Sequence, residues 1–125
     1  MSDVDVRLLD GPPRIPALLA RAVAHSRGRT GADGPLPRHR LVPPAGGQVL
    51  ARLADYCEVT GDVLGDTVPA TWLHVLTFPL QVHLMADRSF PFPMVGMVHV
   101  ANTMTLHRPV RVAETLVLSS WAENV

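Results

Sequence analysis

MVHVANTMTLHRPVRVAETLVLSSW, residues 97–121, is the stretch that decides the fold, because apolar and polar side chains alternate through most of it. Alternation with a period of two places the apolar residues on one face of an extended chain. In the first half these residues are Val98, Val100, Met104 and Leu106. Pro109 has no N–H to donate to a neighbouring strand and ends the first run, and residues 112–121 begin a second. The stretch predicts two long antiparallel strands joined by a turn.

The segment before it, residues 73–87, predicts a helix that is apolar on nearly every face. Its polar side chains form only a thin line, made by His74, Thr77 and Gln81. A helix of this kind belongs in the interior of a protein, and Pro79 is expected to kink it. A buried helix followed by long antiparallel strands is the α+β arrangement of the hotdog fold, in which a curved sheet wraps a central helix.

Two shorter helices are predicted upstream. The first runs from Ile15 to about Arg27, with apolar residues at helical spacing and Pro16 in its first turn. The second follows the PPAGG sequence at residues 43–47, and Gly61 is placed to stop it.

The remaining upstream segments predict little regular structure. Residues 1–14 are expected to be a loose lead-in, residues 28–37 a loop, and residues 38–42 a short extended piece. We therefore divide the chain into an N-terminal lead-in with one short helix, residues 1–35, and a partial hotdog domain, residues 36–125.

Composition excludes several classes of function. Eleven basic residues, all of them arginine, balance eleven acidic ones, so no net charge favours nucleic acid or an anionic membrane as a partner. The absence of lysine excludes Schiff-base chemistry and a P-loop lysine. Charged residues make up only 18% of the chain, which favours a surface partly covered by a partner.

The compartment is predicted from one cysteine and from the N-terminus. Cys57 has no second cysteine with which to pair, which fits a reducing environment. The first residues are acidic where a secretory signal would be basic, and the longest apolar stretch is too short to span a bilayer. We expect a cytoplasmic protein.

Several motifs, in the same order, resemble those of the MaoC-like acyl dehydratases, hotdog proteins that act on acyl thioesters. RPVRVAETL at residues 108–116 is similar to their "PV-basic-V-G-D/E-T-L" signature, with Ala113 in place of the usual glycine. The other matching segments are the Pro-Ala-Thr at residues 69–71, the helix at residues 73–85, the F-P-F-P loop at residues 89–93 and the G-x-V-H-V sequence at residues 96–100. The resemblance covers residues 36 to the end and is greatest to the N-terminal half of double-hotdog members, including enoyl-CoA hydratases.

The resemblance implies a reversible hydration of an enoyl thioester, in which an Asp and a His share one water molecule. The family pattern is G-D-x-N-P-x-H in a region that here begins with Tyr56. Gly61 and Asp62 match it, but Thr67 stands where the His belongs. A hydroxyl cannot replace a neutral imidazole as an acid or base near neutral pH. We therefore expect no catalytic residue in this degenerate motif, and His74 as a displaced acid or base is a less favoured alternative.

The resemblance also suggests a binding site for an acyl-CoA or acyl-carrier thioester, with no cofactor. Flexible methionines and flat rings suit the wall of an acyl channel, although core packing explains them equally well. The candidates are Phe78, Met85, Phe90, Phe92, Met94 and Met97. Arg108 and Arg111 are candidates for a thioester phosphate contact, or else solvated turn residues.

A metal site is not expected. On a helix His74 and His83 would lie about 13 Å apart along the axis, and on a strand His99 and His107 would lie about 26 Å apart. Neither pair can hold one ion.

The implied role is that of a non-catalytic half that completes an acyl channel. Its partner would be a catalytic hotdog domain or subunit, or a second copy of the chain. Only two long strands are predicted, so we expect a hotdog incomplete at its C-terminus, as in a fragment, a truncated product or an obligate subunit. The alternatives are an acyl-CoA thioesterase that uses Glu58 or Asp62, and a structural acyl-binding subunit.

Overall fold

The computed structural model describes residues 5–11, 13–29, 31, 34–43 and 45–123. Its elements, in chain order, are β1 (Asp5–Leu8), α1 (Ile15–Ala24), β2 (His39–Val42), α2 (Leu50–Thr60) and α3 (Ala70–Ala86). β1 and β2 form a two-stranded parallel sheet. The α+β class is therefore confirmed. Those parts of the predicted lead-in, loops and C-terminus that fall on residues 1–4, 12, 30, 32–33, 44 and 124–125 lie outside the described residues.

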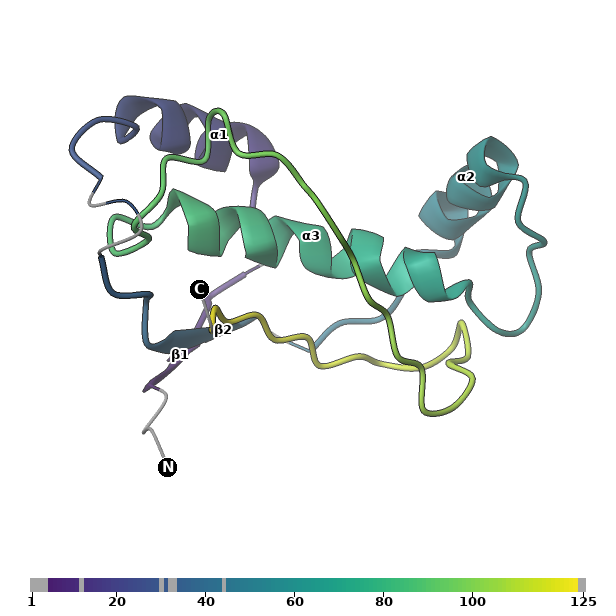
Figure 1. Cartoon of the computed structure of the whole chain (residues 1–125). Helices are drawn as coiled ribbons and strands as arrows, with labels where there is room; N and C mark the ends of the chain where they lie inside the picture. The colour runs from purple at the N-terminus through teal and green to yellow at the C-terminus, as the bar shows by residue number, and fades with distance from the viewer. Residues whose placement is uncertain (1–4, 12, 30, 32–33, 44, 124–125) are drawn as a thin grey trace.

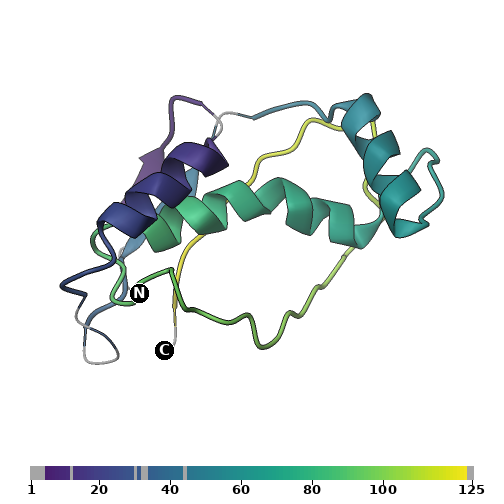
Figure 2. The ribbon, with the colours of Figure 1, turned by 90° about the horizontal axis from the view of Figure 1, so that it is seen from above.

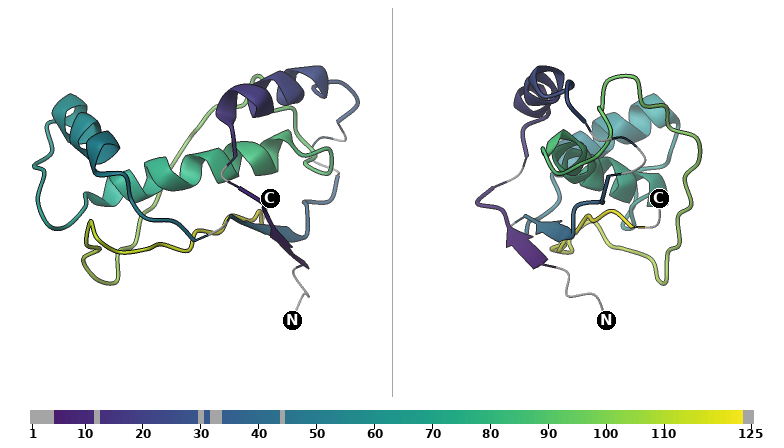
Figure 3. Two further views of the ribbon diagram at one scale, coloured as in Figure 1. Left: turned by 180° about the vertical axis from the view of Figure 1, so that it is seen from behind. Right: turned by 60° about the vertical axis from the view of Figure 1, so that its left-hand side comes forward.

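Helix α3 is the centre of the molecule (Figure 1). α1 lies along its C-terminal half, α2 lies at its N-terminal end, and the two strands lie on the side opposite α1 (Figures 1 and 3). Seen from above, the extended segment that follows α3 runs along one flank of the helix (Figure 2). The prediction of a central helix is confirmed, and the helix begins three residues before the predicted start.

Two apolar clusters bury α3, one at each end. At its N-terminal end Trp72 packs with Leu53 and Cys57 of α2 and with Val68. At its C-terminal end Leu80 and Leu84 pack with Leu41 of β2, joined by Leu9, Leu118 and Ala122. Pro79 lies inside the helix between the two clusters. A helix buried at both ends needs apolar residues on several faces, which explains the sequence pattern.

The two shorter helices follow their local signals. α2 stops at Gly61, which adopts a left-handed conformation (φ 78°) and donates its N–H to the carbonyl of Cys57. Glycine adopts this conformation without the steric cost that a Cβ brings. α1 begins at Ile15 as predicted and ends at Ala24, three residues before the predicted end. Both helices are confirmed.

The loose lead-in is a wrong prediction for residues 5–8. This segment forms β1, whose register pairs Asp5 with His39 and Leu8 with Val42 of β2. All four residues of β1 are exposed. The strand therefore depends on hydrogen bonds to β2, and an amphipathic pattern could not reveal it.

The predicted antiparallel pairing between residues 98–107 and 112–121 is also wrong. Within the described residues no strand is assigned at 95–107, and Val98 and Val100 are 81% and 92% exposed. The second run pairs elsewhere, because Leu116 forms an antiparallel bridge with Gly46 and Ser120 forms another with Leu41. The turn at residues 108–114 separates the two runs, and within it Arg111 forms an antiparallel bridge with Thr67. Alternation shows that a segment is extended, but not which neighbour it finds.

Candidate functional site

Tyr56, the first residue of the degenerate motif, takes part in packing between α2 and α3. Its hydroxyl hydrogen-bonds the hydroxyl of Thr71, and its ring lies 5.3 Å from the ring of Trp72, centre to centre. Trp72 is only 2% exposed. The position of Tyr56 is thus explained by the apolar cluster at this end of α3.

The remaining motif residues lie on an exposed loop that is tied to the 108–114 turn. Asp62 accepts a hydrogen bond from the hydroxyl of Thr60 at 2.7 Å, and Gly61 caps α2. The backbone on either side of Thr67 is fixed, since Val68 donates to the Val110 carbonyl and Val112 donates to the Asp66 carbonyl, each at 2.9 Å. Each contact made by this loop has a structural explanation.

Arg108 forms a two-pronged ion pair with Glu114. Its two terminal nitrogens donate to the two carboxylate oxygens at 2.8 and 2.7 Å, and the backbone N–H of Arg111 donates to the same carboxylate at 2.9 Å. The hydrogen bonds from Arg108 and from the Arg111 backbone lower the pKa of Glu114 to about 2. The Arg108 guanidinium, predicted as a phosphate contact, is therefore engaged with a carboxylate.

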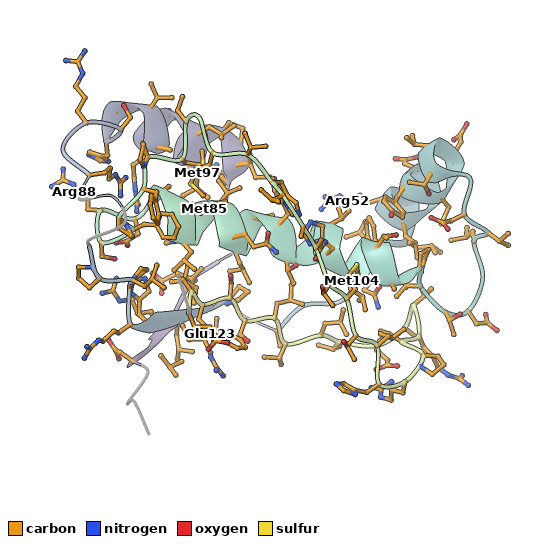
Figure 4. The ribbon with its side chains drawn as sticks, viewed as in Figure 1. Arg52, Met85, Arg88, Met97, Met104 and Glu123 are labelled. Carbon is orange, nitrogen blue, oxygen red and sulfur yellow. The ribbon has the colours of Figure 1, made fainter. Side chains whose placement is uncertain are left out.

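The predicted acyl-channel residues lie around one apolar groove. The groove has a volume of about 560 Å³ and lies between α1, α3, the segment that follows α3, and residues 120–122. Five of the six predicted residues line it: Phe78, Met85, Phe90, Met94 and Met97. Phe92 does not line it, but its ring packs edge-on against that of Phe90 at 6.2 Å. Figure 4 shows Met85 on α3 and Met97 on the segment that passes beside it.

The groove has few polar groups. Gln81, His99 and Ser120 line it together with the apolar side chains, and Trp121 forms part of its wall. The guanidinium of Arg40 lies 3.9 Å from the centre of the Trp121 ring. None of Tyr56, Gly61, Asp62 and Thr67 is among the lining residues. The apolar groove and the degenerate motif are separate sites.

His74, the less favoured catalytic alternative, lies at a different cavity. It lines a cavity of about 290 Å³ between α3 and residues 102–106, and its ring lies 6.3 Å from that of Phe78. Asp62 is not among the lining residues of that cavity. The structure therefore does not place the two residues around a shared site.

A polar cluster at the C-terminal end of α3 is absent from the sequence-based prediction. Asp87 lies 3.7 Å from the guanidinium of Arg7 and 4.0 Å from that of Arg21. Burial alone would raise the pKa of Asp87, but hydrogen bonds from the side chain and backbone of Ser89, with the charges of His39 and Arg7, bring it below its ordinary value.

The two histidines of this cluster are shifted toward their neutral forms. Burial lowers the pKa of His39, and the charge of Arg7 lowers it further. Burial and then the charge of Arg21 lower the pKa of His83 in the same way. The only sequence signal was the presence of ionisable residues at the end of an otherwise apolar helix.

Two possible features are absent from the described part of the chain. It contains no group of three or more His, Cys, Asp or Glu side chains that could hold a metal ion. None of its helices is both long and apolar enough to cross a membrane.

Comparison with known proteins identifies a relative among the dehydratases. Over 75 residues, which is 60% of this chain, the sequence is 37% identical to 3-hydroxyacyl-thioester dehydratase X of Mycobacterium tuberculosis. The match spans 27% of the length of that relative. No protein-family model matches the chain, and no solved structure matches it. The chain is thus homologous to a part of a 3-hydroxyacyl-thioester dehydratase.

Proposed function

We propose that this chain is the acyl-binding, non-catalytic hotdog half of a 3-hydroxyacyl-thioester dehydratase or enoyl-CoA hydratase. The observation that carries the proposal is the apolar groove, around which Phe78, Met85 and Met97 converge from α3 and the segment that follows it. An open groove lined mainly by flexible apolar side chains suits a hydrocarbon chain. The homology to a 3-hydroxyacyl-thioester dehydratase favours an acyl thioester as the ligand.

The arrangement of the chain around α3 supports the hotdog part of the proposal. α3 is central, and the extended segments on either side of the 108–114 turn run along it (Figures 1 and 2). A hotdog sheet would need residues 98–106 to gain a strand neighbour. A catalytic hotdog domain, a separate subunit or a second copy of this chain would supply that neighbour in the reducing compartment that Cys57 suggests.

The state of the degenerate motif supports a non-catalytic role. Asp62 is exposed and bonded to Thr60, Thr67 replaces the expected imidazole, and neither residue lines the groove. Hydration of an enoyl thioester needs an acid and a base within hydrogen-bonding reach of the reacting carbons. We therefore assign catalysis to the partner and acyl binding to this chain.

The first test measures binding through Trp121, which lines the groove. A Trp72→Phe variant keeps Trp121 as the single tryptophan of the chain, so its fluorescence reports ligand in the groove. Crotonyl-CoA and octanoyl-CoA are titrated, with free coenzyme A as the control. Each additional buried CH₂ is expected to tighten binding about fourfold. Equal affinity for all three ligands would contradict acyl binding.

A matched pair of methionines locates the site. Met97 lines the groove and is 45% exposed, whereas Met104 is 40% exposed and lines the cavity beside His74. Figure 4 shows the two on different parts of the same extended segment. Met97→Glu should weaken octanoyl-CoA binding at least tenfold, because it places a carboxylate in an apolar groove, and Met104→Glu should leave the affinity unchanged. Similar losses in both variants would contradict the assignment.

A hydration assay separates binding from catalysis. The chain alone should not hydrate crotonyl-CoA, and it should increase the activity of a catalytic hotdog partner toward trans-2-octenoyl-CoA. Turnover of crotonyl-CoA by the chain alone would refute the non-catalytic role. Hydrolysis of acyl-CoA that disappears in Glu58→Gln or Asp62→Asn would instead identify a thioesterase.

A further inference from the structure

A second cavity, rich in arginine, lies at the C-terminal end of α3. It has a volume of about 570 Å³, and its lining comes from β1, residues 35–39, and the turn that follows α3. Arg7, Arg38 and Arg88 each come from one of these segments, and Asp5 is the one carboxylate among the lining residues that the structure describes. The lining therefore carries an excess of positive charge.

His39 gives this cavity an unmet hydrogen-bonding demand. It lines the cavity, is only 4% exposed, and its Nε2 atom has no hydrogen-bond partner among the described residues. A buried polar atom without a partner costs about 1–3 kcal/mol, and a ligand that hydrogen-bonds it would relieve this cost. A neutral imidazole can carry its proton on Nε2 and donate it to an anion.

The arginines keep much of their capacity to bind a ligand. Arg88 uses one nitrogen on the His25 ring at 3.0 Å, and Arg7 reaches Asp87 only at 3.7 Å. Arg38 forms no ion pair within the described parts of the chain. The Asp87 carboxylate is itself occupied by the backbone and hydroxyl of Ser89, at 2.9 and 2.7 Å. Among the described residues, Arg38 and Arg88 thus form no ion pair, and Arg7 has only its longer contact with Asp87.

We propose that this cavity binds the phosphate group of a small molecule, with Arg7, Arg38 and Arg88 around the anion and His39 as a buried donor. Planar guanidinium groups match the oxygen geometry of a phosphate and bind it through paired hydrogen bonds. The ligand is a diphosphate or a phosphate ester, either free in solution or carried by a coenzyme A thioester. This cavity shares no lining residue with the apolar groove, although both lie at the C-terminal end of α3.

The test uses pyrophosphate and three arginine variants of the full chain. Titration calorimetry at a constant ionic strength of about 0.15 M limits nonspecific attraction between charges. Arg38→Gln and Arg88→Gln should each weaken pyrophosphate binding by roughly 10- to 100-fold, because each removes charge-assisted hydrogen bonds. Arg52→Gln removes the same charge from an exposed site on α2, away from Arg88 in Figure 4, and should have no effect. Equal weakening by Arg52→Gln, or no saturable binding, would overturn the proposal.

Two further titrations identify the source of the phosphate. Coenzyme A that binds and is weakened by Arg38→Gln would identify a thioester carrier, and pantetheine, which lacks phosphate, should then not bind. Pyrophosphate binding that is lost in Arg38→Gln, with coenzyme A unaffected by that substitution, would identify a free anion. The gain in affinity for each added CH₂, reported by Trp121, arises in the apolar groove and not in this cavity, so the two proposals can fail separately.

Discussion

The two ends of α3 differ in where their ionisable groups lie. At the N-terminal end, Asp62 and Glu114 lie on the loop and turn beside an apolar cluster, and each is bonded to a nearby side chain. At the C-terminal end, His39, His83 and Asp87 are partly or fully buried, and all three have shifted pKa values. The end that carries the degenerate motif has the chemistry of a structural turn. The other end has cavities and buried polar atoms, which are the features of binding sites.

This difference teaches that a motif and a site need not coincide. Residues 108–116 resemble a signature of the MaoC-like acyl dehydratases, and the structure uses them to fix a turn against residues 66–68. The groove lies at the opposite end of α3 and is lined by residues outside that signature, among them Phe78, Met85 and Met97. A resemblance to a signature sequence therefore does not by itself locate a binding site.

The largest expected effects come from the apolar clusters. Leu53 and Leu80 are 0% and 1% exposed, one at each end of α3. Leu53→Ala and Leu80→Ala should each lower the free energy of unfolding by about 2–5 kcal/mol, because each leaves a cavity. Leu50→Ala on α2, where Leu50 is 55% exposed, is the matched control and should cost much less.

The same variants test whether the two ends unfold together. Trp72 lies in the N-terminal cluster and Trp121 lines the groove, so Trp121→Phe and Trp72→Phe backgrounds each report one end. Because α3 joins both clusters, we expect coincident urea transitions at the two tryptophans. A Leu53→Ala transition seen by Trp72 at lower urea than by Trp121 would show that the ends are independent.

The next effect concerns the glycine of the degenerate motif. Gly61 has φ 78°, so Gly61→Ala should cost about 1–2 kcal/mol of stability, because a Cβ is unfavourable in this conformation. Gly65→Ala on the same loop is the matched control, since Gly65 is not among the glycines with positive φ. Octanoyl-CoA binding by folded Gly61→Ala should be normal. Loss of binding in this variant would link the motif end to the groove.

A smaller effect should appear in the pH dependence of stability. The pKa of His39 is lower in the folded chain than its ordinary value near 6.5. Below that value the unfolded chain therefore binds more protons than the folded chain does. The free energy of unfolding is therefore not reduced by this histidine above about pH 6.5. It falls as the pH drops toward the pKa of the folded state, by at most about 1.4 kcal/mol per pH unit for each such histidine. His39→Asn should reduce this fall between pH 7.5 and 5.5, measured by urea unfolding. An unchanged slope would show that His39 does not control it.

The smallest effect is expected at the exposed ion pair of the turn. Glu114→Gln should slightly destabilise the protein at neutral pH, and 1 M salt should reduce the difference because it screens exposed charges. The pKa of Glu114 is lowered to about 2. The stabilisation by the ion pair is therefore present above the ordinary pKa of a glutamate and is lost as the pH falls toward 2. Glu58→Gln, at an exposed residue of α2 without an ion pair among those described, is the control. Equal effects of the two substitutions would contradict a role for the pair.

The helices could be predicted because their signals are local. The pattern around Leu73 to Asp87 and the stop at Gly61 each depend on residues within a few turns, and the structure confirms both. Five of the predicted acyl-channel residues line one groove, and they lie close together in the sequence between Phe78 and Met97. Short-range apolar clustering was sufficient to bring them together, and their role in acyl binding stays a prediction.

The pairing of the extended segments could not be predicted, because it depends on distant neighbours. The bond between Leu41 and Ser120 joins residues that no local pattern relates. His83 lies on α3, four residues before Asp87, but His39 comes from β2, and only the folded chain brings it near Asp87. Such buried polar clusters become visible when the tertiary structure supplies both the burial and the partner charges.

The extended segment from Val98 to His107 has a consequence for isotope labelling. From Val98 to His107 no backbone N–H donates to a described carbonyl, whereas the amides of Leu41 and Leu116 do so across a bridge. In deuterated water the amide hydrogens from Val98 to His107 should exchange at nearly the rate of a disordered peptide. The amide hydrogens of Leu41 and Leu116 should be retained until the chain opens. A catalytic subunit that added a strand at Val98 and Val100 would slow exchange at every second amide along this segment, and mass spectrometry could follow its arrival peptide by peptide.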